Sequence, residues 1–198
     1  MPNLRGITTI INNTLKATCF KTQKFQGGSY SDLAYMVIEE PTQENQLEIR
    51  RPAIISNYGE CIPVNPDDTY PLVIYHRNTS LLYEDDETQS FGDPGQDIKE
   101  TADMLLICIG DRKNLQVVQE DVVSAIWANI PRNLTTAQLQ ALQLEKVIIE
   151  PADINVNPID VWSQEITNVP YPLDPNNFML SIKYRIITIY NKNCYQFC

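Results

Sequence analysis

The 198-residue chain has one histidine, His76, and only seven glycines. A Ser-His-Asp or Cys-His catalytic site would have to recruit His76, which lies in an apolar segment beside Arg77, and the chain has no G-x-S-x-G or cysteine-protease signature. With so few glycines, the backbone can approach a phosphate in few places, and Gly27-Gly28 fits neither the dinucleotide-binding nor the P-loop pattern. The sequence therefore predicts neither a catalytic residue nor a cofactor-binding residue.

Basic residues are also few, with 15 Lys and Arg against 25 Asp and Glu, for a net charge of −10. This balance disfavours a non-specific grip on nucleic acid, which needs cations to displace phosphate counterions. It is compatible with an acidic surface that nucleic acid passes without sticking, because like charges repel. No stretch approaches the roughly 20 apolar residues that span a bilayer, and the first ten residues lack the apolar core of a signal peptide. We expect no membrane partner.

The cysteines are odd in number and scattered: Cys19, Cys61, Cys108, Cys194 and Cys198. Without a sign of export they are interpreted as reduced thiols, and Cys108 is expected in the core because it lies in an apolar run. Cys194 and Cys198 have a spacing that a metal could use, but a structural zinc needs four ligands. The remaining ligands would have to come from single, distant residues (Cys19, Cys61 or His76). We expect a C-terminal tail with free thiols and no metal.

The chain is organised around residues 102–130. The apolar run 104–109 predicts a strand buried on both faces, and a polar turn follows it. Asn114 can cap a helix over 114–130, which Pro131 ends. This helix would carry an apolar stripe of residues spaced by three or four: Leu115, Val118, Val122, Ile126 and Ile130.

Other segments have clear local patterns. Residues 3–19 predict an N-terminal helix with the stripe Leu4, Ile7, Ile11 and Leu15. Strands are predicted at 33–38, at 72–77 (running on or turning at Asn78 toward 81–83) and at 146–150, and Gly27-Gly28 is expected to break the chain. Thr135 and Gln138 form a capping box for a short helix, in which Leu134 can contact Leu139. Residues 178–190 alternate strictly, which predicts an antiparallel strand with one dry face and one wet face.

Prolines punctuate residues 41–71 and 151–177, which favours long loops with short strands at 53–56 and 159–165. Residues 84–97 form a polar loop between two strands, so an extended hairpin is expected there. Together these elements predict one α+β domain over residues 1–198: a mainly antiparallel sheet packed with two main helices, the N-terminal helix and 114–130.

The hairpin loop is strongly acidic, with Glu84, Asp85, Asp86, Glu87, Asp93 and Asp97. Carboxylates can hold calcium or magnesium, but the EF-hand spacing is absent. A solvated, self-repelling loop is the better interpretation, so no metal site is predicted here.

The order of the predicted elements resembles that of a known group of proteins. Residues 102–130 and the ending FMLSIKYRIITIY with its short polar tail resemble the tail-terminator and tail-completion proteins of tailed bacteriophages. The ending and the abundance of Asn and Ile are similar to the head-to-tail ring proteins of crAss-like phages of gut Bacteroidota. The likeness is one of layout and covers about residues 70–190.

The resemblance implies a structural virion protein, made in the host cytoplasm, that forms a six- or twelvefold homo-oligomeric ring at the head-to-tail junction. Its partners would be its own copies and portal or tail proteins, and DNA would pass through the lumen without specific binding. The acidic loop 84–97 would line that lumen or contact a neighbouring subunit. Neither enzymatic activity nor a cofactor is implied.

Two alternatives from other classes stay open. One is an acidic metal-dependent hydrolase that uses Asp85, Asp86, Asp93 or Asp103 around His76. The other is a monomeric adaptor protein. Metal binding would favour the first alternative, and a monomer in the presence of its partners would favour the second.

Overall fold

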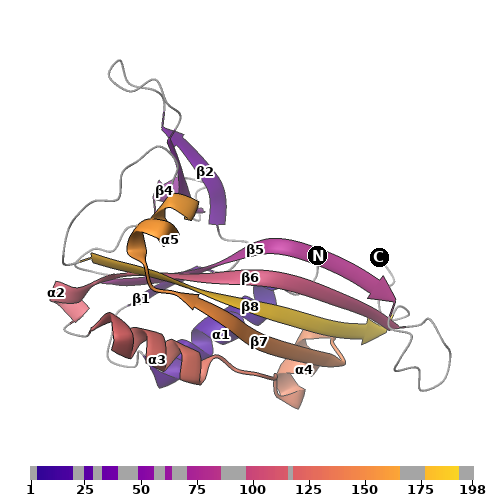
Figure 1. Ribbon diagram of the computed structural model, residues 1–198. Coiled ribbons are helices and arrows are strands. Elements are labelled where there is room, and N and C mark those ends of the chain that lie inside the picture. The colour runs from indigo at the N-terminus through magenta and orange to yellow at the C-terminus, as the bar shows by residue number, and fades with distance from the viewer. Residues whose placement is uncertain are drawn as a thin grey trace.

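The computed structural model describes residues 4–19, 25–28, 33–39, 49–55, 61–63, 71–85, 97–115, 118–165 and 177–191. Its main sheet has five strands, in the spatial order β1 (Phe25–Gly28), β5 (Leu72–Asp85), β6 (Asp97–Asp111), β8 (Asn177–Asn191) and β7 (Lys146–Asn155) (Figure 1). Among the described strands of this sheet, β1 and β5 are parallel neighbours and the other pairs are antiparallel. A second antiparallel sheet consists of β2 (Leu33–Glu39), β3 (Ile49–Ile55) and β4 (Cys61–Pro63). The predicted α+β class with a mainly antiparallel sheet is confirmed.

The predicted hairpin is formed by β5 and β6, paired from Leu72 opposite Gly110 to Asp85 opposite Ile98. β5 does not turn at Asn78; it runs on, and a bulge between Asn78 and Ser80 takes up one residue. β6 is buried from Met104 to Gly110, as its apolar run predicts, and Cys108 is in the core. The loop 86–96 lies outside the described residues.

Three helices cover one face of the sheet: α1 (Leu4–Thr18), α3 (Gln119–Asn129) and α4 (Thr136–Leu142). The predicted stripe of α1 is entirely buried between this helix and the sheet: Leu4, Ile7, Ile11 and Leu15. Removal of these side chains from water, worth about 25 cal/mol per Å² of apolar surface, holds the layers together. The main core therefore lies on the helical side of the sheet.

The helix expected over 114–130 is wrong at its start. The chain forms a short helix, α2 (Arg112–Leu115), and then begins α3 at Gln119. Val118 has extended backbone and is 55% exposed, whereas Leu115, Val122 and Ile126 are buried as predicted. The side chain of Gln119 accepts a hydrogen bond from Arg112 and donates one to the carbonyl of Val156. These contacts with residues outside the helix place the start of α3 at Gln119. The local capping signal at Asn114 therefore does not determine where the helix begins.

The capping box of α4 is confirmed. The backbone N–H of Gln138 donates to Thr135 Oγ1 at 3.3 Å, and the backbone N–H of Thr135 donates to Gln138 Oε1 at 2.9 Å. Leu134 is buried, and Leu139 packs against the same core. This helix is therefore determined locally, as its sequence predicts.

The predicted edge strand at 159–165 is wrong, because this segment is a helix, α5 (Pro158–Glu165). Asn157 caps it: its Oδ1 accepts from the Ile159 amide at 3.1 Å, and its Nδ2 donates to Asp160 at 2.9 Å. Pro158 occupies the first helical position, which proline favours. β7 instead runs on through Pro151, with a bulge between Pro151 and Asp153. The sequence Asn157-Pro158-Ile159-Asp160 is typical of a helix start. The many prolines between residues 151 and 177 favoured the interpretation as loop and edge strand instead.

Further differences concern segments near the N-terminus. Gly27 and Gly28 do not break the chain but pair with β5 in β1. The strand predicted at 33–38 is confirmed as β2, and the one at 53–56 begins earlier, at Ile49. In Figure 1 the second sheet rises from the left end of the main sheet, above α5.

The second face of the main sheet is covered by α5 only at one end. There, Val161 and Trp162 of α5 pack on a smaller apolar cluster made of Val73, Tyr75, Leu105, Ile107, Ile109 and Met179. The expected wet face of β8 is therefore dry at Met179 and Ser181 and wet at Lys183 and Arg185. Beyond α5 this face is open among the described residues (Figure 1).

Candidate functional site

His76 does not lie in an open site. Its side chain is fully buried on the helical side of the sheet, where Nε2 is 2.9 Å from Asn12 Oδ1 and Nδ1 is 2.8 Å from the hydroxyl of Tyr184. An amide oxygen only accepts, so Nε2 carries the proton and Nδ1 accepts from Tyr184. Burial lowers the pKa of His76 to about 3 and raises the pKa of Tyr184. Both side chains therefore stay uncharged at neutral pH, and the hydrogen bond between them is retained.

The version of the hydrolase alternative that places Asp103 beside His76 is wrong, because the two side chains lie on opposite faces of the sheet. Asp103 lies on the opposite, open face of the sheet, where its carboxylate accepts from Ser80 Oγ at 2.7 Å and from Arg185 Nε at 2.9 Å. These two donors hold the pKa of Asp103 below its usual range. The Ser80 contact ties Asp103 to the bulge of β5 and the Arg185 contact ties it to β8, so Asp103 acts as a structural residue.

The acidic hairpin residues are only partly described. Glu84 and Asp85 end β5 opposite Lys99 and Ile98, and Asp97 begins β6. Their side chains, and all of Asp86, Glu87 and Asp93, lie outside the described residues. The structure therefore places both ends of loop 84–97 at one end of the sheet and leaves the prediction about its role untested.

The other candidate ligands do not come together where the structure describes them. Cys108 is buried, which raises the pKa of its thiol, and Cys19 is half-buried with Sγ 3.2 Å from the carbonyl of Ala125. The side chain of Cys61 and all of Cys194 and Cys198 fall outside the described part of the chain. Among the residues that are described, no group of three His, Cys, Asp or Glu could hold a metal ion.

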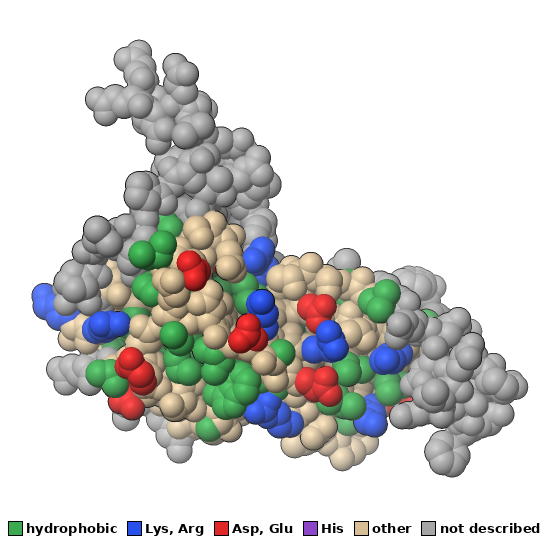
Figure 2. Space-filling model, viewed as in Figure 1, with side chains coloured by type: hydrophobic (Ala, Val, Ile, Leu, Met, Phe, Trp, Pro, Cys, Tyr) green, Lys and Arg blue, Asp and Glu red, His purple; other side chains and the backbone are tan. Residues whose placement is uncertain are grey.

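The open face of the sheet is the strongest candidate for a functional surface. Strand register arranges its side chains in rows across β5, β6, β8 and β7. The row beside α5 is Arg77, Leu105, Lys183 and Asp153; the next is Ser80, Asp103, Arg185 and Glu150; the third is Leu82, Thr101, Ile187 and Ile148. Two rows with charged side chains thus lie between α5 and a mainly aliphatic row, and Figure 2 shows the mixture of basic, acidic and apolar side chains across this face.

A depression of about 290 Å³ lies in this face next to α5. Its lining includes three cations and one carboxylate: Arg77, Lys183, Arg185 and Asp103. Thr79 and Gln164 add neutral polar groups. Lys183 and Arg185, which are 65% and 51% exposed, present cationic groups to solvent there, each beside a carboxylate.

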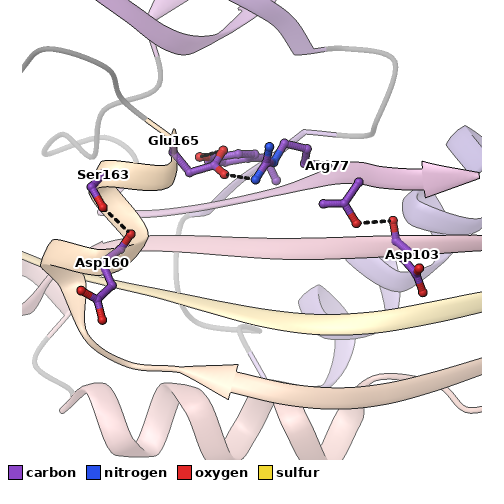
Figure 3. Close-up of polar contacts among 7 residues, drawn as sticks. Arg77, Asp103, Asp160, Ser163 and Glu165 are labelled. Carbon is purple, nitrogen blue, oxygen red and sulfur yellow. Dashed lines mark hydrogen bonds and ion pairs between the residues drawn. The ribbon is translucent and has the colours of Figure 1, made fainter.

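An ion pair holds α5 against the sheet at the edge of this depression. Glu165, whose side chain is 1% exposed, lies with Oε1 2.8 Å from Arg77 Nη2 and accepts from the Tyr75 hydroxyl at 3.3 Å (Figure 3). Burial raises the pKa of Glu165, and Arg77 and Tyr75 oppose that rise. Sequence reasoning missed this cluster, because Glu165 is about 90 residues from its partners and stands in a segment that the prolines marked as loop.

Replacing Arg77 with methionine should lower the free energy of unfolding at pH 7 by about 2 kcal/mol, because it leaves a buried carboxylate without its cation. In a Glu165→Gln background the same replacement should cost less than about 1 kcal/mol, since no buried charge is left behind. Urea unfolding of the four proteins measures this coupling. Equal costs in both backgrounds would mean that the pair does not hold α5.

The pH dependence of the same cluster has a defined sign. Because burial raises the pKa of Glu165, the folded protein retains this proton at pH values where the unfolded chain has released it. Relative to the Glu165→Gln variant, the wild type should lose stability as the pH rises through the interval between the ordinary and the raised pKa. The opposite trend in urea midpoints would contradict the assignment.

Two other depressions lie on different surfaces. One, of about 520 Å³, is an apolar groove between α1 and α4 lined by Gly6, Ile10, Ala137, Ala141 and Leu142, among others. The other, of about 360 Å³, lies where Gln119 and Val123 of α3 meet Val156. Neither groups titratable side chains as the open face does.

No described helix is long and apolar enough to cross a membrane. No protein-family model matches the sequence, and no curated protein is significantly similar to it. The function therefore has to be argued from the surface that the fold exposes.

Proposed function

We propose that this protein is a structural subunit of a tailed-bacteriophage particle and forms a homo-oligomeric ring at the head-to-tail junction. DNA would pass through the lumen of the ring without being specifically bound. The observation that carries the proposal is the sheet itself: three strands of 14 or 15 residues, covered by helices on one face and open over much of the other. A typical strand has about five or six residues, so this sheet offers an unusually long surface.

An open sheet face with an aliphatic row is suited to contact with another protein. Ile148 and Ile187 are half-buried and Leu82 is 54% exposed, so this row keeps apolar surface in water. Burial of such a row against a partner removes apolar surface from water, and the flanking charges set the partner's orientation. These features favour an assembly subunit over an adaptor that works as a monomer.

The charge of the chain is consistent with passage of DNA. A ring of subunits that each carry −10 presents a strongly negative assembly, which repels the phosphate backbone and does not retain it. In such a ring the acidic loop 84–97 faces either the lumen or a neighbouring subunit.

The first test is negative-stain microscopy of the full chain, alone and mixed with phage particles that lack it, with light scattering to measure mass. We expect closed rings or added density at the head-to-tail junction. A protein that remains monomeric and adds no density to such particles would overturn the proposal. Tight binding of Mg²⁺ or Ca²⁺ in calorimetry would instead support the hydrolase alternative.

A further inference from the structure

We propose that Lys183 and Arg185, at the depression on the open sheet face, bind the acidic hairpin loop 84–97 of a second copy of this chain. This inference rests on the proposed ring and names the contact that builds it. It gives loop 84–97 the role of a subunit contact, in place of a lumen lining.

The exposed cations at the depression and the acidic loop have opposite charges. Of the three cations that line the depression, Arg77 is paired with the buried Glu165, whereas Lys183 and Arg185 remain exposed beside Asp153 and Asp103. Loop 84–97 has six acidic residues and neither Lys nor Arg. In a protein of net charge −10, copies repel one another over most of their surface, so contact is favoured where opposite charges meet.

Two of the cations are available to a partner even though each has a neighbour. Lys183 is 65% exposed and its Nζ is 3.9 Å from Asp153, an exposed pair of the kind that contributes little. Arg185 is 51% exposed, and its Nε–H donates a hydrogen bond to Asp103. This bond uses one of the five N–H groups of the Arg185 guanidinium. The remaining N–H groups suit the bidentate binding of a carboxylate.

The two surfaces lie apart on one molecule. Along β6, six residues separate Asp97 at the hairpin end from Asp103 beside the depression, a distance of roughly 20 Å at about 3.3 Å per residue. A surface at the end of one copy that fits a different surface on the next copy gives a head-to-tail contact. Contacts of this type generate rings when the rotation closes.

The test uses two charge-reversed proteins, each made as the full chain. The face variant is Lys183→Glu with Arg185→Glu, and the hairpin variant is Glu84→Lys, Asp85→Lys, Asp86→Lys and Glu87→Lys. Sedimentation velocity at about 10 mM salt, where the Debye length is about 30 Å, measures self-association. Relative to wild type, each variant alone should associate about 100-fold more weakly, because like charges then face each other.

Mixing the two variants provides the decisive result. The reversed face of one then meets the reversed hairpin of the other, and each unmodified surface also finds an unmodified partner, so the mixture should regain association within about tenfold of wild type. The matched control is Lys16→Glu with Lys113→Glu, which gives the same net charge as the face variant at exposed positions on α1 and α2. This control should associate within about threefold of wild type. Lys183→Glu alone, which leaves the Arg185–Asp103 pair intact, guards against misfolding of the double variant and should weaken association about tenfold.

Several outcomes would overturn the inference. They are a wild type that stays monomeric at low salt, equal weakening by the face variant and its control, and a mixture that does not recover. Intact rings from the hairpin variant with blocked DNA passage would assign the loop to the lumen, and the proposed function would stand. Failure of the wild type to join particles, with the charge-swap rescue intact, would remove the proposed function and keep the contact.

Discussion

Acidification from pH 7 to pH 4 is expected to lower the free energy of unfolding by about 3 kcal/mol through His76 alone. The unfolded chain binds a proton at this imidazole near the ordinary pKa of about 6.5, whereas burial lowers the pKa of the folded protein to about 3. Between these values the unfolded state holds more protons, so stability rises with pH and is lost as the pH falls below about 6.5. Each unit corresponds to about 1.4 kcal/mol.

The structural reason is the sealed chain of hydrogen bonds. Protonation of Nδ1 would remove the acceptor for Tyr184 and place a charge among Asn12, Tyr184 and the core of the sheet. A buried unpaired charge is far more costly than the loss of a single hydrogen bond.

Two measurements check this expectation. Because His76 is the only histidine, its Cε1 proton resonance is identified without assignment, and it should not titrate between pH 8 and pH 4. In parallel, urea unfolding of His76→Gln should show a weaker loss of stability on acidification than the wild type, since a neutral amide replaces the imidazole. A resonance that titrates near pH 6.5 would show that His76 is accessible to solvent and protons.

Replacement of Gly110 with alanine should lower the free energy of unfolding by about 3 kcal/mol, at the upper end of the usual cost of overpacking. Gly110 of β6 lies directly opposite Phe178 of β8, whose ring is fully buried over it. A Cβ at Gly110 would be 3.0 Å from Phe178 Cε2 and would overlap Cζ and Cε1. Since β6 is paired on both sides, neither the backbone nor the ring can move without loss elsewhere.

The matched control is Gly6→Ala in α1. There a Cβ meets the end of the flexible, half-buried Leu142 side chain, and alanine gains about 1 kcal/mol of helix propensity over glycine. We expect a net change below about 1 kcal/mol. Combining Gly110→Ala with Phe178→Leu should cost less than the two single changes together, which thermal or urea unfolding can measure. Strict additivity would show that the ring is not the cause.

Elements with a strong local pattern could be predicted from the sequence. The stripe of α1, the capping box at Thr135 and the alternation of β8 depend on residues two to four apart, so neighbouring positions carry the whole signal. The hairpin of β5 and β6 followed from two strands joined by a polar loop. The interruption at Val118 could not be predicted in this way, because Gln119 is held by Arg112 and Val156.

By itself, the sequence determined the α+β class, the acidic charge, the hairpin and the two main helical segments. Only the tertiary structure decided which face of the sheet stays open, because that depends on where α5 packs. Its place is set by Glu165, which contacts Tyr75 and Arg77 across about 90 residues of chain. The gathering of Arg77, Lys183 and Arg185 around one depression likewise depends on strand order and register. Pairing between distant strands is selected by the packing of the whole sheet, and no local pattern in the sequence specifies it.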